Sequence, residues 1–296
     1  MPLQEMNARF GREGRVAVVE GRNGLPKVQL FHPGGAKAEV YLHGAHVTSW
    51  KAAGDRELFF ISKESHFETG KPIRGGIPVI FPQFGGGPLP AHGFARLTEW
   101  EPTLSAVEEN GDVECVLHLE DTPATRQLWP HPFRLELAVT LAARALAVRM
   151  TVENSGAAPF SFTAALHTYF SVADVRRVAV RGLRGVTYLD TLRDDARAVE
   201  TPEAITFSAE TDRIYVAAPD VVQVEDASRR RTITIHKHNM PDVVVWNPWT
   251  AKAQRMPDFG DTEYPRMVCV ETGHVAEPHA VPAGGVWQGS TRFRVS

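Results

Sequence analysis

Two ionisable side chains, His167 and Glu271, are of the types that move protons between oxygen atoms. A histidine and a glutamate can each titrate near neutral pH, so one can act as an acid and the other as a base. His167 lies in the strand-like run 159–171, where its spacing puts it off the apolar face, and Glu271 ends the apolar run 267–271. By themselves these patterns favour an ordinary hydrogen-bonded histidine and a solvated strand end, and a catalytic role needs further support.

A second group of polar residues lies in the segment 73–100, which is rich in glycine and proline and is therefore predicted to form loops. Loops on a β scaffold are where binding residues concentrate. The segment carries Arg74, Gln83, His92 and Arg96. Two arginines can hold a phosphate or a carboxylate through paired hydrogen bonds. The glycines match no nucleotide-binding motif.

The same two arginines also have a purely structural interpretation. Each could pair with a carboxylate of the chain, for which Glu99 and Asp55 are candidates. The sequence does not decide between this pairing and an anion-binding role.

Metal sites are not indicated by the spacing of the twelve histidines. The closest pairs, His43 with His46 and His236 with His238, have no cysteine or carboxylate at ligand spacing. We therefore expect neither a metal nor a cofactor.

Composition excludes several classes of protein. The chain has 296 residues with 32 Lys+Arg and 35 Asp+Glu, a formal net charge of −3, which argues against a nucleic-acid partner. No apolar stretch is long enough to span a membrane, and the first residues do not resemble a secretion signal. Cys115 and Cys269 lie in apolar runs and are expected to be buried reduced thiols, which favours a cytoplasmic location.

The elements that position these residues follow a period of two. Apolar side chains alternate along 133–141 and again along 145–154, with a three-residue link, which predicts a β-hairpin with one buried face. No segment has a convincing helical period. Further strands are predicted at 16–19, 28–32, 38–42, 57–62, 113–120, 159–171, 177–183, 221–226, 231–238, 243–247, 267–271 and 291–296. We expect one all-β domain over residues 1–296, a large antiparallel β-sandwich.

Several strings of the sequence, in order along the chain, resemble the glucose-6-phosphate 1-epimerases, a branch of the aldose 1-epimerase (galactose mutarotase-like) superfamily. The most specific strings are RGGIP in 74–78 and HGFAR in 92–96, and LHTYF in 166–170 and VCVE in 268–271 occur more widely. Other matching strings are AEVYLHGAHVTSWK (38–51), ETDRIY (210–215), VVVWNPW (243–249) and DFGDTEY (258–264). The resemblance covers nearly the whole chain and implies a β-sandwich of the galactose mutarotase type.

The resemblance also implies roles for individual residues. His167 of LHTYF would be the catalytic acid, and Glu271 of VCVE would be the catalytic base. Arg74 of RGGIP, Arg96 of HGFAR and Asp212 of ETD would bind substrate.

One position departs from the family pattern. Some members have a substrate-binding glutamine directly before the HGFAR histidine, where this chain has Ala91. We expect that contact to be absent or supplied by Gln83 or water. His92 itself matches the pattern and is expected to bind substrate.

The function implied by the resemblance is exchange between the α and β anomers of hexose 6-phosphates, chiefly glucose 6-phosphate. The enzyme would be an isomerase that acts as a monomer without a cofactor. Two alternatives stay open: a mutarotase of unphosphorylated aldoses, and a sugar-phosphate binding protein without turnover. The cationic pair of Arg74 and Arg96 argues against the first, and retention of His167 and Glu271 argues against the second.

Overall fold

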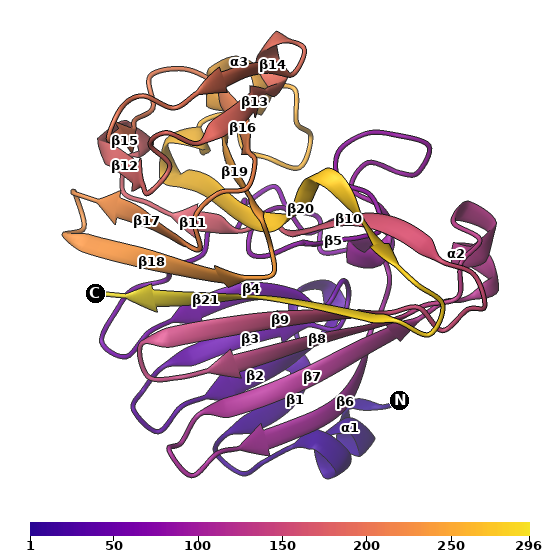
Figure 1. Cartoon of the computed structure of the whole chain (residues 1–296). Coiled ribbons are helices and arrows are strands. Elements are labelled where there is room, and N and C mark those ends of the chain that lie inside the picture. The colour runs from indigo at the N-terminus through magenta and orange to yellow at the C-terminus, as the bar shows by residue number, and fades with distance from the viewer.

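The structure is a computed structural model of residues 1–296, in which most of the chain forms three antiparallel sheets (Figure 1). The first is a four-stranded meander in the order β1-β2-β3-β4. Its strands are β1 (Val16–Glu20), β2 (Pro26–Phe31), β3 (Lys37–Tyr41) and β4 (His46–Lys51).

A second sheet has eight strands in the order β14-β13-β16-β19-β20-β10-β5, with β11 also paired to β20. Its strands are β5 (Val79–Ile80), β10 (Phe160–Leu166), β11 (Tyr169–Ser171), β13 (Thr187–Asp190), β14 (Ala196–Val199), β16 (Thr211–Tyr215), β19 (Asp242–Asn247) and β20 (Met267–Val281).

The third sheet has nine strands in the order β15-β12-β17-β18-β21-β9-β8-β7-β6. Its strands are β6 (Glu101–Val107), β7 (Val113–Glu120), β8 (Arg134–Leu141), β9 (Ala145–Glu153), β12 (Val178–Arg181), β15 (Ala204–Ile205), β17 (Val221–Asp226), β18 (Arg231–His238) and β21 (Val286–Val295). In Figure 1 this sheet runs across the middle of the molecule, with β20, β10 and β5 above it.

A single apolar core of 62 buried residues joins the three sheets. The β8–β9 hairpin shows why: its alternating side chains pair in register, Val139 opposite Val148 and Leu141 opposite Leu146, and all four are buried. Burial of such alternating faces is the main force that holds a β-sandwich together. The predicted all-β antiparallel fold is confirmed.

Helices are few and short. They are α1 (Leu3–Phe10), α2 (Pro123–Leu128) and α3 (Trp249–Ala253), with the 3₁₀ turns η1 (Arg22–Gly24), η2 (Ala95–Leu97), η3 (Val175–Arg177), η4 (Thr191–Arg193) and η5 (Tyr264–Arg266). No helix has the length and apolar character required to cross a membrane.

The strands predicted at 267–271 and 291–296 are observed as longer strands, β20 and β21, and two other predicted strands do not form as single strands. The run 57–62 forms only isolated bridges, because it crosses from one pairing partner to another: Glu57 to Lys51, Phe59 to Phe170, and Ile61 to Gly75. The predicted strand 159–171 is divided into β10 and β11, with His167 and Thr168 between them.

The eight-stranded sheet is buried on both faces near its centre. On one face, Val243, Val245, Val268 and Val270 belong to the main core. The opposite face carries two smaller apolar clusters, one around Tyr169 and Trp246 and one around Ala165 and Val244. This second face holds the candidate site.

Candidate active site

Four side chains lie in one row across neighbouring strands of the eight-stranded sheet. Asp212 on β16 pairs with Trp246 on β19, Trp246 pairs with Cys269 on β20, and Cys269 pairs with Tyr169 on β11. Because strand side chains alternate between faces, the next row on the same face lies two residues further along each strand. Glu271 therefore follows Cys269 on this face.

His167 lies two residues before Tyr169, just before the start of β11, and faces Glu271. Its Nδ1 is 3.3 Å from Oε1 of Glu271. The backbone fixes this position, since the His167 N–H donates to the carbonyl of Pro78 and the Val270 N–H donates to the carbonyl of Thr168. The two residues predicted as acid and base are thus brought together.

The His167–Glu271 pair is almost completely withdrawn from solvent. His167 is 7% exposed and Glu271 is 1% exposed. Nδ1 of His167 and Oε2 of Glu271 are buried without a hydrogen-bond partner. Burial lowers the pKa of His167 and raises the pKa of Glu271, because a low-polarity environment disfavours the charged form of each.

Aromatic rings hold the imidazole of His167 in place. The ring of Tyr169 stacks on it at a centroid distance of 4.8 Å and an interplanar angle of 10°. His92 and Trp246 contact it edge-on, at 5.4 and 6.1 Å. His167 therefore has little freedom to change its orientation.

The Arg74 side chain binds two other side chains, those of Asp258 and Tyr169. Its Nε donates to Asp258 Oδ2 at 3.1 Å, and Nη2 forms an ion pair with the same oxygen at 3.0 Å. Nη1 donates to the Tyr169 hydroxyl at 3.0 Å. Burial alone would lower the pKa of Arg74, but Tyr169 and Asp258 together raise it above its usual value. Arg74 is therefore paired with a carboxylate, although neither Glu99 nor Asp55 is that partner.

Arg96 has no such partner. It lies in η2, is 8% exposed, and donates through Nη2 only to the carbonyl of Ala91 at 2.8 Å. Its Nε is buried without a hydrogen bond, and no carboxylate forms an ion pair with it. Burial lowers the pKa of Arg96 to about 10, and the charge of Arg74 acts in the same direction. The structural interpretation, a pair with Glu99, does not hold.

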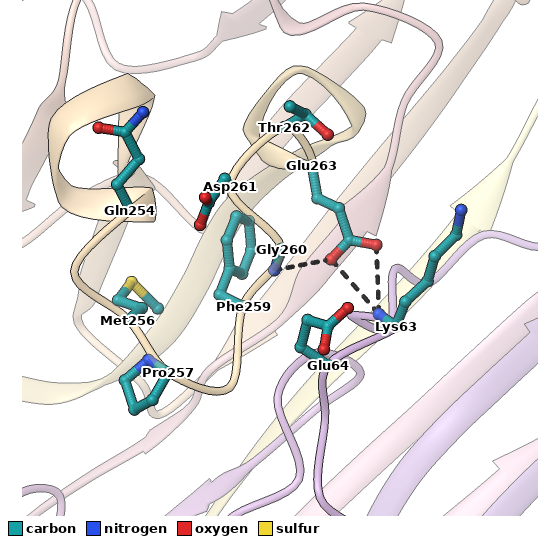
Figure 2. A pocket seen from close by; sticks show the side chains of 10 residues that line it. All are labelled: Lys63, Glu64, Gln254, Met256, Pro257, Phe259, Gly260, Asp261, Thr262 and Glu263. Atoms are coloured by element: carbon teal, nitrogen blue, oxygen red, sulfur yellow. Dashed lines mark hydrogen bonds between the residues drawn. The ribbon is translucent and has the colours of Figure 1, made fainter.

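A loop after α3 presents Asp258 to Arg74. This loop lines a hollow of about 490 Å³. Figure 2 shows Glu263 in its lining, where the carboxylate accepts hydrogen bonds from the backbone of Gly260 and Lys63. Glu263 also accepts from the Ser62 hydroxyl at 2.7 Å. These bonds fasten the 254–263 loop to the segment that leads to Arg74.

His92 borders the site, with its ring against His167 and Phe84. Its Nδ1 accepts from the Gly85 N–H at 3.2 Å, so the neutral ring carries its proton on Nε2. Burial lowers the pKa of His92 to about 3, with contributions from nearby cations. His92 is therefore a neutral hydrogen-bond donor.

Gln83 forms hydrogen bonds within its own loop. Its amide nitrogen donates to the carbonyls of Gly85 and Leu89, and its amide oxygen accepts from the Leu89 N–H. Both ends of the Gln83 amide are therefore bound to its own loop, and a contact of Gln83 with substrate in place of the missing glutamine stays a prediction.

Asp212 lies at the edge of the row, beside a cation that none of the sequence motifs pointed to. Its Oδ2 is 3.4 Å from Nζ of Lys252 on α3, which also lies 5.6 Å from the ring of Trp246. Burial raises the pKa of Asp212, and Lys252 opposes this shift. In the sequence, Lys252 lies three residues after Trp249, which ends the VVVWNPW string.

The site also contains a donor set that spacing alone did not reveal. One ligand atom from each of His167, Cys269 and Glu271 lies within 4.8 Å of the others. Both cysteines are free and buried, as predicted.

Comparison with known proteins agrees with this geometry. A model of the aldose 1-epimerase family matches residues 26–294. A protein of Cenchrus ciliaris, named a candidate glucose-6-phosphate 1-epimerase, is 41% identical over 283 residues, covering 92% of this chain and 85% of that protein. A protein of Escherichia coli K12 with the same name is 37% identical over 275 residues and covers 90% of each chain.

Among solved structures, that of a candidate mutarotase from Salmonella typhimurium has a TM-score of 0.88 at 32% identity. The match covers 95% of this chain and 94% of that one. Fold, family model and sequence relatives agree over nearly the full length, and the chain belongs to the aldose 1-epimerase family.

Proposed function

We propose that the protein interconverts the α and β anomers of hexose 6-phosphates, chiefly glucose 6-phosphate. The observation that carries this proposal is the buried His167–Glu271 pair, 3.3 Å apart, in a cluster that also holds the unpaired cation Arg96. The pair fits acid–base chemistry on a sugar, and Arg96 fits an anionic group on that sugar. The names of relatives at 37–41% identity support the same substrate class.

The proposed reaction opens and closes the sugar ring. Glu271 removes the proton from the anomeric hydroxyl while His167 protonates the ring oxygen, and the C1–O5 bond breaks to give the open aldehyde. Rotation about C1–C2 presents the other face of the carbonyl, and the ring closes with the two roles reversed. The pair carries the same number of protons before and after each half-reaction, so neither a leaving group nor a cofactor is needed.

Burial sets the resting protonation of the pair. Both side chains prefer their neutral forms, since burial lowers the pKa of His167 and raises that of Glu271. The charged and neutral versions of the pair differ only in the position of one proton. The reaction starts from the Glu271 carboxylate and the His167 imidazolium, which the neutral pair reaches when one proton moves from Glu271 to His167 across the 3.3 Å between them.

Substrate binding is assigned to the surrounding polar groups. Arg96 meets the phosphate, with Arg74 held nearby by Asp258. Asp212 accepts from sugar hydroxyls, and the Nε2–H of His92 donates to a sugar oxygen.

A mutarotase of free aldoses is the second candidate, and one observation favours it. Arg74 is already paired with Asp258 and Tyr169, so only one buried cation is left without a carboxylate. If Arg96 alone does not bind the phosphate, the same acid–base pair would act on glucose or galactose.

Anomer exchange followed by NMR decides between the candidates. Glucose 6-phosphate, glucose and galactose are compared at equal concentration with the same protein sample. We expect exchange to be fastest for glucose 6-phosphate. Faster exchange of a free sugar would support the second candidate, and no acceleration of any of the three would leave a binding protein without turnover.

The proposal also extends to organisation and location. We propose that the protein acts as a monomer. One core that joins all three sheets supports a single domain over residues 1–296. Two free, buried thiols fit a reducing compartment such as the cytoplasm.

A further inference from the structure

Cys269 lies in the middle of the candidate site, although the proposed reaction gives it no role. It sits on β20 two residues before Glu271, on the same face, and its strand neighbours are Tyr169 and Trp246. It is completely buried. Burial raises the pKa of its thiol, and the nearby Glu271 adds to the shift, so the thiol is protonated in the free protein.

The thiol is one of three converging donors. Ligand atoms of His167, Cys269 and Glu271 lie within 4.8 Å of one another, and Nδ1 of His167 is 3.3 Å from Oε1 of Glu271. Nδ1 of His167 and Oε2 of Glu271 are buried polar atoms without a hydrogen-bond partner. A buried polar atom left unsatisfied is costly, and a cation placed among these atoms would satisfy both at once.

The spacing and the chemistry of these three ligand atoms indicate which metal ion they could bind. Nitrogen, thiolate and carboxylate ligands around a tetrahedral Zn²⁺ lie about 3.5 Å from one another, given metal–ligand bonds of about 2.0–2.3 Å. The observed separations reach 4.8 Å, so the widest must close by about 1.3 Å for the three atoms to share one ion. A thiolate favours Zn²⁺ and Cd²⁺ over Mg²⁺ or Ca²⁺, which prefer oxygen ligands. Three protein ligands leave a fourth position for water.

We propose that His167, Cys269 and Glu271 form an inhibitory site for a thiophilic divalent cation, Zn²⁺ or Cd²⁺. On binding, metal–nitrogen, metal–sulfur and metal–oxygen bonds form, and the protons of the thiol and of the carboxyl group are released to solvent. The ion occupies the imidazole nitrogen and the carboxylate that the reaction needs, so metal and catalysis exclude each other. The inhibition rests on the proposed function, whereas the binding does not.

Metal binding can be measured without any assay of activity. Cd²⁺ is titrated into chelator-treated protein while the ultraviolet absorbance of the thiolate–Cd²⁺ bond is followed. We expect one Cd²⁺ per chain, with the absorbance lost in Cys269→Ser and Cys269→Ala. In Glu271→Gln, where the thiol is kept, the affinity should fall at least about 10-fold, the lower end of effects seen even for outer-shell changes.

Cys115 provides the matched control. It is also free and buried, and burial raises its pKa to about 12, but it lies on β7 in the nine-stranded sheet and belongs to no group of converging donors. Cys115→Ser should bind Cd²⁺ as the original protein does. Thermal melts of all variants show which of them are folded.

A second experiment tests whether the bound metal inhibits anomer exchange. Zn²⁺ should stop anomer exchange in the original protein and in Cys115→Ser, and a chelator should restore it. Cys269→Ala should need at least about 100-fold more Zn²⁺ for the same inhibition. Absence of the Cd²⁺–thiolate absorbance, or its loss in Cys115→Ser but not in Cys269→Ser, overturns the site. Cd²⁺ binding at Cys269 in a protein inactive on every sugar would instead refute the proposed function and leave the site standing.

Discussion

Arg96 is the residue whose removal best separates a hexose 6-phosphate from a free sugar. It is the buried cation of the site without a carboxylate partner, and it makes one hydrogen bond, to the carbonyl of Ala91. In the proposed function, a phosphate at C6 of the substrate supplies the missing negative charge. Substituting Arg96→Ala should therefore lower kcat/KM for the phosphorylated substrate and leave kcat/KM for the free sugar nearly unchanged.

The expected size of the effect follows from the contacts available. A charge-assisted hydrogen bond contributes about 1.5–3 kcal/mol, and each ~1.4 kcal/mol changes an equilibrium or rate ratio tenfold. Arg74 keeps part of the attraction, because it stays in place beside Asp258. We expect kcat/KM on glucose 6-phosphate to fall by roughly 10–100-fold.

Arg231 offers a matched control. It is also a buried arginine, but it binds the carbonyl of Ser171 and lies near Asp55, outside the cluster around His167. Arg231→Ala should lower thermal stability and affect both sugars alike. The assay is anomer exchange by NMR on glucose 6-phosphate and on glucose, together with a thermal melt of each variant.

An equal loss on both sugars in Arg96→Ala would refute the reasoning. In that event Arg96 acts by holding the 91–96 loop through Ala91, and the free-aldose function gains support. Arg96→Lys provides a further check, because it keeps the charge and removes the planar fork. It should retain part of the preference for the phosphorylated sugar.

Three further outcomes are expected. His167→Ala and Glu271→Gln should each reduce turnover at least ~10²-fold, the lower end for a positioned acid or base, with thermal melts that stay cooperative; near-normal exchange in either would remove that residue from the mechanism. Treatment with a strong chelator should leave anomer exchange undiminished, and a loss that a divalent ion restores would show a metal requirement. Glu271→Gln should be more stable than the original protein at pH 8, and urea unfolding should show this advantage shrinking toward pH 4. The sign follows because burial raises the pKa of Glu271 in the folded state, so the original protein loses stability as the pH rises above the pKa of the unfolded state. A tenfold difference between the two acid dissociation constants corresponds to about 1.4 kcal/mol of unfolding free energy.

The sequence predicts the parts of this fold in which one face of a strand is buried. The β8–β9 hairpin is predictable because its alternation and its short link leave one register that buries every apolar side chain. The run 57–62 looks similar in composition but forms no strand, since its backbone pairs with three different segments in turn. Such changes of partner depend on distant residues and leave no local pattern.

The helices escape prediction for a different reason. The longest, α1, has eight residues and buries only Met6 and Phe10. A stripe of two residues is too short to show a helical period, so packing against the sheets decides whether such a segment is helical.

Contacts between loops likewise cannot be predicted from the sequence. Arg74 is a candidate from its motif, but its partner Asp258 lies 184 positions away, and nothing near either residue indicates the pairing. By contrast, the spacing of Cys269 and Glu271 does contain a usable signal. Because the two residues are two positions apart in a strand, their side chains lie on the same face. A site built around Glu271 is therefore expected to have the thiol of Cys269 beside it.

Strands carry one half of the proposed site, and loops carry the other. Asp212, Trp246, Cys269 and Tyr169 occupy paired positions on four strands, and Glu271 lies one row further on the same face. A slip of one residue in any of these pairings would turn the side chains of that strand to the opposite face, so the sheet register itself sets the geometry of the acid–base pair. Arg74 and Arg96 lie outside regular strands, where a loop can move without disturbing that register. In the proposed function, the sheet register therefore fixes the acid–base pair, and loop side chains that can change independently of that register set the choice of substrate anion.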